Sequence, residues 1–320
     1  MLYNCISKLN TVIILEVVVG RTVIDVKDAR KTYVMGQEKI RAVDGVSFTI
    51  EEGEFCCILG TSGSGKSTLL NLLAGIEKLT AGDIIINGSS IKKMNEKKLS
   101  KFRQENLGFV FQAYNLLGSM TALENVELPL VFKRLAPGKR KRMARSILKK
   151  VGLGDRMDHK PKEMSGGQQQ RVGIARAFVA KPKIVFADEP TGNLDSRTTI
   201  EVMELIKGMA LKNKLTIVMV THDISLSKYA DKIIHVSDGK ITEIEYNENP
   251  LGADLGTAEA ADNTKADKPE VTAKNLKKAK ETDNNTVTGS DKGEIKTNMG
   301  EPGKQGDPVK IKETSNEESK

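Results

Sequence analysis

A glycine-rich loop constrains the fold of this 320-residue chain more than any other feature. The loop runs from Gly60 to Ser67 with the sequence GTSGSGKS, which matches the phosphate-binding pattern G-x-x-x-x-G-K-S. A nearly continuous apolar run at 54–59 precedes the loop, and residues 67–74 follow it with helical spacing. An apolar run that ends in glycine is typical of a strand buried on both faces of a parallel sheet. The order strand, loop, helix therefore predicts a phosphate site on an α/β fold.

The residue types in this loop fit the chemistry of a bound nucleotide. Glycines let successive backbone N–H groups converge on a phosphate, and a helix N-terminus adds positive potential. Lys66 is expected to bridge two phosphates, and the Ser67 hydroxyl is expected to bind Mg²⁺, a hard ion that takes few protein ligands. The predicted nucleotide-binding residues of this segment are Gly60, Thr61, Ser62, Gly63, Ser64, Gly65, Lys66, Ser67 and Thr68.

Short runs rich in β-branched residues predict the other strands. Residues 22–26 and 46–50 are expected to form an antiparallel flank, with turns at Gly36, Gly45 and Gly53. Further strands are predicted at 83–87, 107–111, 183–187, 216–220 and 233–236. Apolar residues at three- and four-residue spacing predict helices within 121–150 and at 199–211. The alternation of strands and helices predicts a parallel α/β core.

Two acidic residues come directly after one of the predicted buried strands. Asp188 and Glu189 follow the strand at 183–187, which places both carboxylates at the carboxyl edge of the sheet, where ligands of such folds bind. Upstream of this strand lies the segment Ser-Gly-Gly-Gln at 165–168.

The glycine-rich loop, the Ser-Gly-Gly-Gln segment and the acidic strand end, in this order, resemble the ATP-binding cassette family. The resemblance covers roughly residues 22–245. It implies a P-loop NTPase core with a mixed sheet, an antiparallel β flank, and an inserted helical subdomain at about 113–181. It also implies that the chain hydrolyses ATP with Mg²⁺.

Further site residues follow from the resemblance. Asp188 is expected to hold Mg²⁺ through water, and Glu189 is expected to polarise the attacking water. His222, after the strand at 216–220, is expected to bond the γ-phosphate and orient that water. Gln112 resembles the glutamine that reaches both Mg²⁺ and the water, and it leads into the helical subdomain. Tyr33 resembles the aromatic residue that stacks on adenine.

The Ser-Gly-Gly-Gln segment predicts a dimer. Its hydroxyl and backbone donors at a helix N-terminus suit a γ-phosphate, yet two anion sites of one chain cannot reach the same nucleotide in this fold. The family arrangement is a head-to-tail dimer with two composite sites, and Asn193-Leu194-Asp195 resembles the loop that crosses that interface. Met164 stands where leucine is commoner, a swap that conserves volume. The residues expected at the partner's nucleotide are Ser165, Gly166, Gly167, Gln168 and Asp195.

The segments 115–117 and 121–130 are similar to those of ATPases that serve lipoprotein-releasing, macrolide-export and antimicrobial-peptide-resistance systems. This similarity implies an integral membrane permease as partner and a peripheral position at the cytoplasmic face of the membrane. The permease would export or extract peptides, lipoproteins or drug-like molecules. A switch that signals across the membrane without moving cargo fits the same sequence.

Charge alone does not choose the partner. Residues 1–247 carry 38 Lys and Arg against 27 Asp and Glu, a balance that suits a nucleotide, an anionic membrane or nucleic acid. A DNA-maintenance ATPase is a further alternative, but the compact stretch between Lys66 and Asp188 has neither sustained heptads nor Cys pairs. Nucleic acid is therefore not an expected partner. The basic run at 139–145 favours a solvated helix face over a lipid-facing patch.

The two ends differ in composition from residues 21–246, the predicted ATPase domain. Residues 1–20 are interpreted as a loose extension or a misplaced start, since their apolar run is too short to span a bilayer. Residues 247–320 are predicted to be a disordered charged tail, because they contain no aromatic residue and too little apolar surface to offset ordering entropy. Cys5, Cys56 and Cys57 are too few for a disulfide framework and fit a reducing compartment. His159 and His235 match no site and are expected to be structural.

Overall fold

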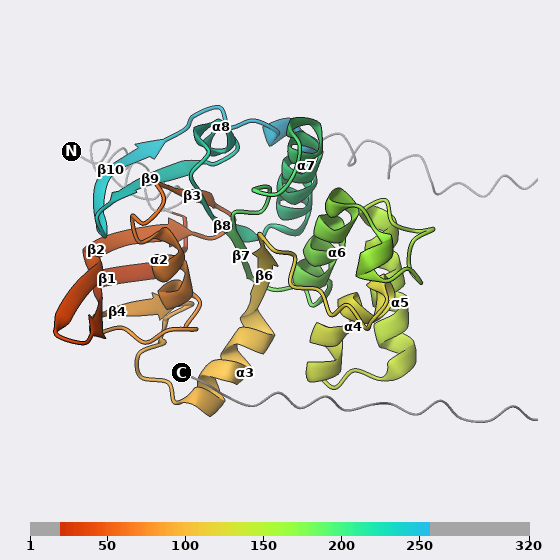
Figure 1. Cartoon of the computed structure of the whole chain (residues 1–320), viewed down its shortest axis with the longest axis horizontal. Coiled ribbons are helices and arrows are strands. Elements are labelled where there is room, and N and C mark those ends of the chain that lie inside the picture. The colour runs from red at the N-terminus through yellow and green to blue at the C-terminus, as the bar shows by residue number, and fades with distance from the viewer. Residues whose placement is uncertain (1–19, 257–320) are drawn as a thin grey trace, which may run out of the picture. The chain divides into compact units, whose positions relative to one another are not determined.

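The computed structural model describes residues 20–256, which form two β-sheets and the helices that cover them (Figure 1). The predictions for residues 1–19 and for residues 257–320 lie outside these described residues.

The larger sheet has six strands in the order β10-β9-β3-β8-β7-β6. These strands are β3 (Phe55–Leu59), β6 (Leu107–Phe111), β7 (Ile184–Asp188), β8 (Thr216–Thr221), β9 (Lys232–Ser237) and β10 (Lys240–Tyr246). Neighbouring strands from β9 to β6 pair in parallel, whereas β10 pairs antiparallel with β9. Every residue of β3 and β8 is buried, as expected for strands covered on both faces. The predicted mixed sheet of an α/β fold is confirmed.

The smaller sheet is antiparallel, in the order β2-β1-β4-β5. Its strands are β1 (Thr22–Met35), β2 (Glu38–Glu51), β4 (Ala81–Ile86) and β5 (Ser89–Ser90). The predicted flank is confirmed, but its first two strands are longer than the sequence pattern indicated. The turn predicted at Gly45 is wrong: this residue lies inside β2 with φ +77°, where the pairing with β1 shifts by one residue. Glycine permits the left-handed backbone of a β-bulge, so it interrupts the ladder without ending the strand.

The six-stranded sheet separates two hydrophobic cores, because successive strand residues point to opposite faces. Cys56 and Ile58 face a core shared with the antiparallel sheet and with α2 (Lys66–Leu73). Cys57 and Leu59 face the core formed with the helical region and with α7 (Ser196–Asn213). The sheet thus holds the ends of its strands rigidly between two packed layers.

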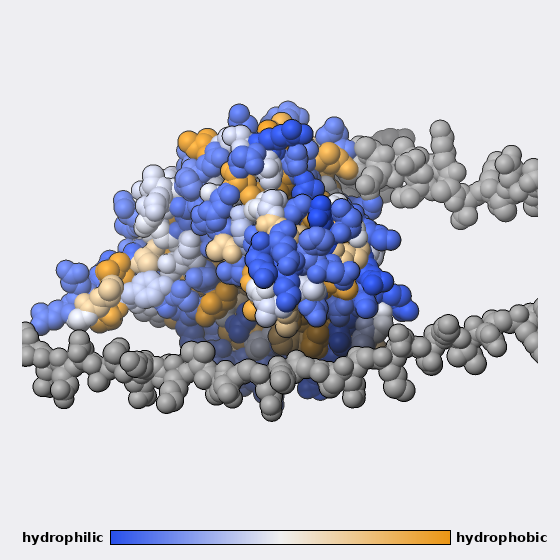
Figure 2. Space-filling view, turned by 45° about the vertical axis from the view of Figure 1, so that its right-hand side comes forward, coloured by the Kyte–Doolittle hydropathy of each residue, from blue (hydrophilic) through white to orange (hydrophobic). Residues whose placement is uncertain are grey.

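The predicted helical subdomain contains α4 (Ala122–Phe132), α5 (Pro137–Lys150) and α6 (Gly166–Val179), which lie together beside the β6 end of the sheet (Figure 1). The helical stretch predicted at 121–150 consists of two helices, and Pro137 begins the second. Figure 2 brings this side forward and shows a largely hydrophilic face with separate apolar patches.

The two longest elements that escaped prediction did so for the same reason. In α3 (Glu96–Asn106) only Leu99 is buried, and β10 has six exposed residues of seven. Elements with so little buried surface leave almost no hydrophobic period in a sequence.

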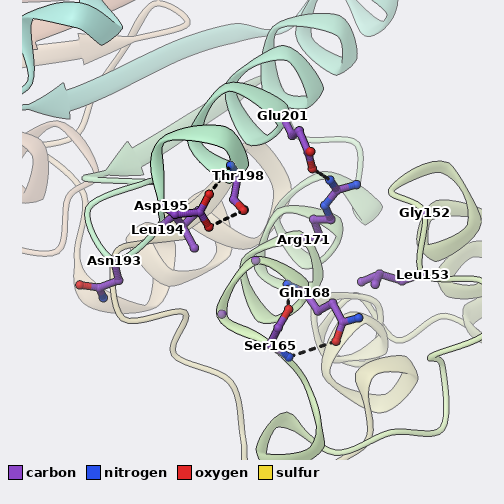
Figure 3. A pocket seen from close by; sticks show the side chains of 12 residues that line it. Gly152, Leu153, Ser165, Gln168, Arg171, Asn193, Leu194, Asp195, Thr198 and Glu201 are labelled. Carbon is purple, nitrogen blue, oxygen red and sulfur yellow. Dashed lines mark hydrogen bonds and ion pairs between the residues drawn. The ribbon is translucent and has the colours of Figure 1, made fainter.

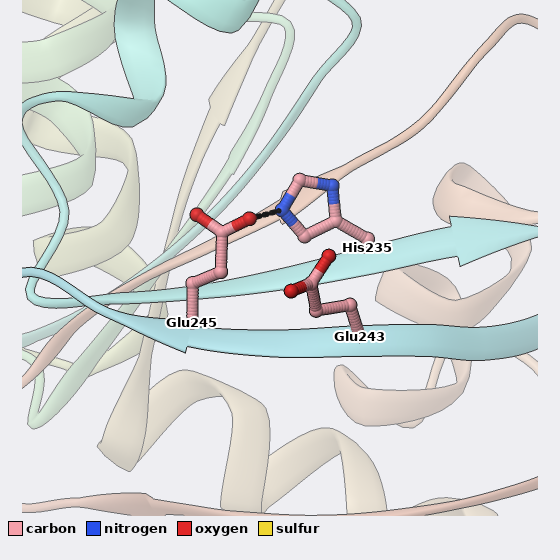
Figure 4. A group of neighbouring side chains, drawn as sticks. All are labelled: His235, Glu243 and Glu245. Carbon is pink, nitrogen blue, oxygen red and sulfur yellow. Dashed lines mark ion pairs between the residues drawn. The ribbon is translucent and has the colours of Figure 1, made fainter.

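Edge strand β10 is joined to β9 by side chains as well as by its backbone. His235 Nε2 lies 2.9 Å from Glu245 Oε1, and Glu243 projects toward the same pair (Figure 4). One ligand atom from each of the three residues lies within 4.8 Å of the others. The side chains thus link the two strands, and the structural role expected of His235 stays a prediction.

The first ten residues of the predicted tail are placed against the domain. The Asn247 amide donates to the Asp231 carbonyl at 2.9 Å, and the Leu251 amide donates to the Lys228 carbonyl at 2.8 Å. A short 3₁₀ turn, η2 (Ala253–Gly256), then packs on α7. Because of these backbone hydrogen bonds, the ordered domain extends beyond the boundary predicted after residue 246. Amino-acid composition gives no information about such bonds. Among the helices within residues 20–256, none is long and apolar enough to cross a bilayer.

Candidate functional site

The glycine-rich loop connects β3 to α2, and its backbone allows no larger residue at two positions. A Cβ atom on Gly65, whose φ is +98°, would lie 2.1 Å from the Ala42 carbonyl oxygen, and one on Gly60 would lie 2.2 Å from the Val236 carbonyl oxygen. Helix α2 begins without any side-chain cap hydrogen bond. The free N–H groups of its first turn are therefore available to an anion.

The loop borders a cavity of about 480 Å³ at the carboxyl edge of the sheet. Predicted site residues from four separate segments line it, namely Ser62, Gly63, Gly65, Lys66, Ser67, Thr68, Gln112, Asp188, Glu189 and His222. Gly60, Thr61 and Ser64 belong to the loop but do not line the cavity. Lys66 is only 6% exposed, and its ammonium donates to the Thr61 carbonyl at 2.7 Å. A single fixed cation thus lies at the rim of the anion site.

Oxygen donors suited to Mg²⁺ meet in this cavity. Ser67 Oγ lies 3.4 Å from Asp188 Oδ1, and the Gln112 side chain lines the same space. Burial raises the pKa of Asp188; the Ser67 hydrogen bond opposes this shift, and the charge of Glu189 adds to it. A carboxylate that is costly to ionise, beside a hydroxyl and an amide oxygen, fits a hard divalent cation.

Glu189 is held in an unusual backbone conformation at the end of β7. Its φ is +45°, and its amide donates to the Val220 carbonyl at 3.0 Å. The carboxylate accepts a hydrogen bond from Thr221 Oγ1 at 3.3 Å and lies 2.9 Å from His222 Nδ1. A non-glycine residue in this conformation is strained, and such strain clusters at functional sites. The arrangement fixes one carboxylate toward the cavity, next to an imidazole.

Thr221 is a site residue that the sequence analysis missed. Its signal was only a hydroxyl residue at the end of a buried strand, one position before His222. The contact with Glu189 joins residues 32 positions apart, and only the pairing of β7 with β8 brings them together.

Tyr33 lies outside the cavity. Its hydroxyl donates to the Glu77 carboxylate, and the Lys31 ammonium lies 4.9 Å from the centre of its ring. Burial, and then the bond to Glu77, raise the pKa of Tyr33. Adenine stacking on Tyr33 stays a prediction, since a stacked base would have to share or replace the Lys31 contact.

The Ser-Gly-Gly-Gln segment forms a second cavity of about 440 Å³ at the start of α6 (Figure 3). Ser165 and Gln168 form a capping box: Ser165 Oγ accepts from the Gln168 amide at 3.3 Å, and Gln168 Oε1 accepts from the Ser165 amide at 3.0 Å. A Cβ on Gly167 would meet the Thr198 methyl group at 2.6 Å, and one on Gly166 would meet the Tyr114 hydroxyl at 2.9 Å. A larger residue at either position would have to displace the Tyr114 or Thr198 side chain.

The Asn193-Leu194-Asp195 loop lines the second cavity and connects it to the first. Asp195 caps α7 by accepting from the amides of Arg197 and Thr198 at 3.1 and 3.0 Å, and the Thr198 hydroxyl lowers the pKa of Asp195. Asn193 Nδ2 donates to the Gln112 carbonyl at 3.0 Å. This hydrogen bond links the loop at 193–195 to the segment that contains Gln112.

The two cavities share no lining residue. One holds the phosphate loop, the acidic pair and His222, whereas the other holds Ser165 and its glycines. Each chain thus presents two helix N-termini at separate cavities.

Known proteins share these features. The model of the family described as "ABC transporter" matches residues 43–192. The chain is 42% identical over 223 residues to the lipoprotein-releasing system ATP-binding protein LolD of Syntrophotalea carbinolica, covering 70% of this chain and 98% of that protein. It is 45% identical to the macrolide export ATP-binding/permease protein MacB of Hyphomonas neptunium, over 68% of this chain but only 34% of MacB. The chain thus spans about a third of that relative.

A solved structure shows the same fold. The dimeric post-hydrolysis structure of the ATP-binding cassette MJ0796, bound to ADP and Pi, has a TM-score of 0.66 and 43% identity, and covers 70% of this chain and 98% of that one. Sequence, fold and site geometry together identify the protein as a member of the ABC transporter family that carries the family's ATP-binding domain.

Proposed function

We propose that two copies of this chain pair head to tail and hydrolyse ATP at two composite sites. The observation that carries the proposal is that α2 and α6 each direct an N-terminus into a different cavity of one chain. A rotated second copy would bring the α6 end of one chain to the α2 cavity of the other. The dimeric neighbour bound to ADP and Pi supports this arrangement.

The residues of the cavity beside α2 have different roles in ATP hydrolysis, according to their chemistry. The α2 amides and Lys66 bind the phosphates, and Ser67, Asp188 and Gln112 would hold Mg²⁺, which neutralises phosphate charge when bound. Glu189 accepts a proton from the attacking water, while His222, bonded to the same carboxylate, keeps that water and the γ-phosphate aligned. Ser165 of the partner copy donates its hydroxyl to the γ-phosphate.

In this proposal the partner is a membrane permease, to which the conformational change of the ATPase dimer is transmitted. The names of the relatives LolD and MacB support a peripheral position at the cytoplasmic membrane face and an exported or extracted lipoprotein, peptide or drug-like substrate. The helical subdomain also exposes apolar side chains: Phe132 is 61% exposed, Leu117 46% and Val131 41%. Such exposed apolar residues mark a protein contact. Signalling without cargo uses the same contact and stays an alternative.

Two measurements test the proposal. The specific ATPase activity of purified protein should fall as the chain is diluted below its dimerisation constant. An activity that stays constant for isolated protomers would contradict the dimer.

A photo-crosslinker placed at Ala113, next to Gln112, should capture an integral membrane protein in native membranes. Capture of DNA-bound or purely soluble proteins instead would contradict the permease.

A further inference from the structure

A groove lies at the edge of the parallel sheet opposite the nucleotide cavity. It encloses about 680 Å³ between α5 from Arg142 onward, the loop that follows α6, and the loop that joins α7 to β8. Lys183 and Leu215 line it, and each immediately precedes the amino end of a strand, β7 or β8. Asp188 and Glu189 lie at the opposite end of β7, and His222 follows the opposite end of β8. The groove is therefore separate from the ATP site.

The groove has a basic rim and an apolar floor. Its cationic lining residues are Arg142, Lys150, Lys181, Lys183, Lys212 and Lys214, whereas Glu52 is its one acidic lining residue. Met143, Ile147, Phe178 and Leu215 contribute apolar surface. Within residues 20–256, none of Arg142, Lys150, Lys181, Lys183 or Lys214 forms an ion pair.

Helix dipoles explain only part of this charge. Lys150 and Lys212 stand in the last turns of α5 and α7, where cations are favourable. Arg142 lies in the first half of α5, and Lys181, Lys183 and Lys214 follow their helices in loops. Cations that gather from three elements around a concave apolar surface repel one another unless an anionic group lies between them.

The described chain ends next to this groove. The Cβ atom of Leu255 is 3.9 Å from the position a Cβ on Gly208 would take, and Gly208 precedes the groove residue Lys212 by one helical turn on the same face of α7. At the helical rise, the stretch from Gly208 in α7 to Lys214, the residue that follows α7, covers only about 9 Å.

The residues that follow are complementary in charge to the groove. Between Asp254 and Thr264 the sequence holds three acidic residues, Asp254, Glu259 and Asp262, and the first cation comes at Lys265. Three alanines, at 258, 260 and 261, separate the acidic side chains with small apolar ones. An extended chain of six residues from Gly256 to Asp262 reaches at most about 20 Å, enough to pass Lys214.

We propose that residues 257–262 dock in this groove of their own chain, with Glu259 and Asp262 among the rim cations and the alanines on the floor. Each contact is that of a weak surface ion pair, but the short tether makes the binding intramolecular, at an effective concentration of order millimolar. Docking would join α5 of the helical subdomain to the amino edge of the core sheet.

Zero-length crosslinking of the full chain tests the proposal. A water-soluble carbodiimide should join Glu259 or Asp262 to Lys150, Lys181, Lys183 or Lys214 in preference to exposed lysines elsewhere, as mapped by mass spectrometry of tryptic peptides. The yield should fall when salt is raised from about 0.05 M to 1 M, since the Debye length falls to about 3 Å.

Charge reversal supplies the matched control. Arg142→Glu with Lys183→Glu should lower crosslinking to the remaining groove lysines about fivefold or more. Lys39→Glu with Lys93→Glu makes the same charge change at exposed positions that do not line the groove, and should leave the yield within about twofold. Equal yields in both variants, or crosslinks spread over all exposed lysines, would overturn the proposal. So would groove crosslinks found only between two copies.

A second measurement keeps the proposal testable if charge reversal impairs folding. With Cys5 replaced by Ser, the pair Ser146→Cys and Ala260→Cys should form a disulfide under mild oxidation, because Ser146 lines the groove. The control pair Lys93→Cys and Ala260→Cys should remain reduced. Disulfide formation at equal rates in both pairs would overturn docking.

Discussion

The N-termini of α2 and α6, the two helix ends that we expect to meet phosphate, are built in opposite ways. At α2 the cap position is Gly65, no side chain bonds the first turn, and the loop contributes a buried ammonium from Lys66. At α6 Ser165 closes the first turn with a reciprocal capping box to Gln168, and its cavity holds no comparable buried cation among its lining residues. The first end is open and charged, whereas the second has already satisfied part of its hydrogen bonding.

This difference suggests separate roles for the two helix ends in a dimer of two chains. Open amides and Lys66 can hold a nucleotide without a partner, because they neutralise phosphate charge directly. Ser165 Oγ accepts the bond from the Gln168 amide, so its own hydroxyl hydrogen remains free to donate. We infer that α2 determines affinity for the nucleotide and that α6 reports the γ-phosphate across the dimer.

The largest effect is expected where both helix ends act at the same time. Glu189→Gln removes the proton acceptor but keeps the shape, so hydrolysis should fall roughly 10²- to 10⁴-fold while ATP holds the α6 end of one copy on the α2 cavity of the other. Size-exclusion chromatography with ATP should show an accumulated dimer. Glu96→Gln, at an exposed position on α3 beside Lys78, is the control and should hydrolyse normally. Normal hydrolysis by Glu189→Gln would show that another residue is the base.

The next effect should separate affinity from closure. Lys66→Ala should weaken ATP binding by roughly 10- to 100-fold, because a charged hydrogen bond contributes about 1.5–3 kcal/mol. Binding is measured by titration of a fluorescent ATP analogue, with Lys97→Ala, an exposed cation on α3, as control. Ser165→Ala should leave this affinity unchanged under conditions where the protein stays monomeric. A large loss of monomer affinity in Ser165→Ala would remove the distinction between the two ends.

Thermal stability separates the capping role of Ser165 from its expected role at the γ-phosphate. Ser165→Ala removes the cap and should cost about 1 kcal/mol, a fall in Tm of roughly 2–4 °C for a domain of this size. Ser165→Asp restores a capping acceptor but adds a negative charge toward the γ-phosphate, so it should recover Tm and still lose hydrolysis. Recovery of hydrolysis in Ser165→Asp would show that capping alone is the role of this residue.

The smallest effect is expected for the folding free energy, because the cavity beside α2 partly buries the Asp188 carboxylate. The pKa of Asp188 is raised in the folded state, so its ionised form opposes folding once the pH exceeds the pKa of the unfolded chain. Asp188→Asn should therefore raise Tm slightly at pH 7 without nucleotide, and the gain should vanish toward pH 3. The variant should bind Mg²⁺-ATP more weakly. A lower Tm at pH 7 would show that Ser67 and Lys66 outweigh the burial cost.

Sequence patterns predicted the core of the fold because its strands are buried on both faces and its ligand residues follow strand ends. Asp188, Glu189 and His222 occupy such positions, and the parallel pairing of β7 with β8 brings the acidic pair and the imidazole into one cavity. Gln112 follows β6 in the same way.

Features that depend on contacts distant in sequence could not be predicted. The Tyr33–Glu77 bond and the Thr221–Glu189 bond join residues whose neighbours along the chain give no sign of the partner. The bulge at Gly45 and the turn at Gly36 look alike in sequence, since glycine permits both. The capping box at Ser165, in contrast, is local and is visible in the sequence as the spacing S-x-x-Q.

The most direct test of the composite site mixes two inactive variants. Lys66→Ala lacks a working α2 cavity and Ser165→Asp lacks a working α6 end, but a mixed dimer contains one site in which both ends are intact. Random pairing should restore up to about a quarter of the wild-type ATPase activity per chain, measured by phosphate release at equal total protein. An activity no higher than the sum of the two separate variants would show that each chain completes its own site, and would contradict the account.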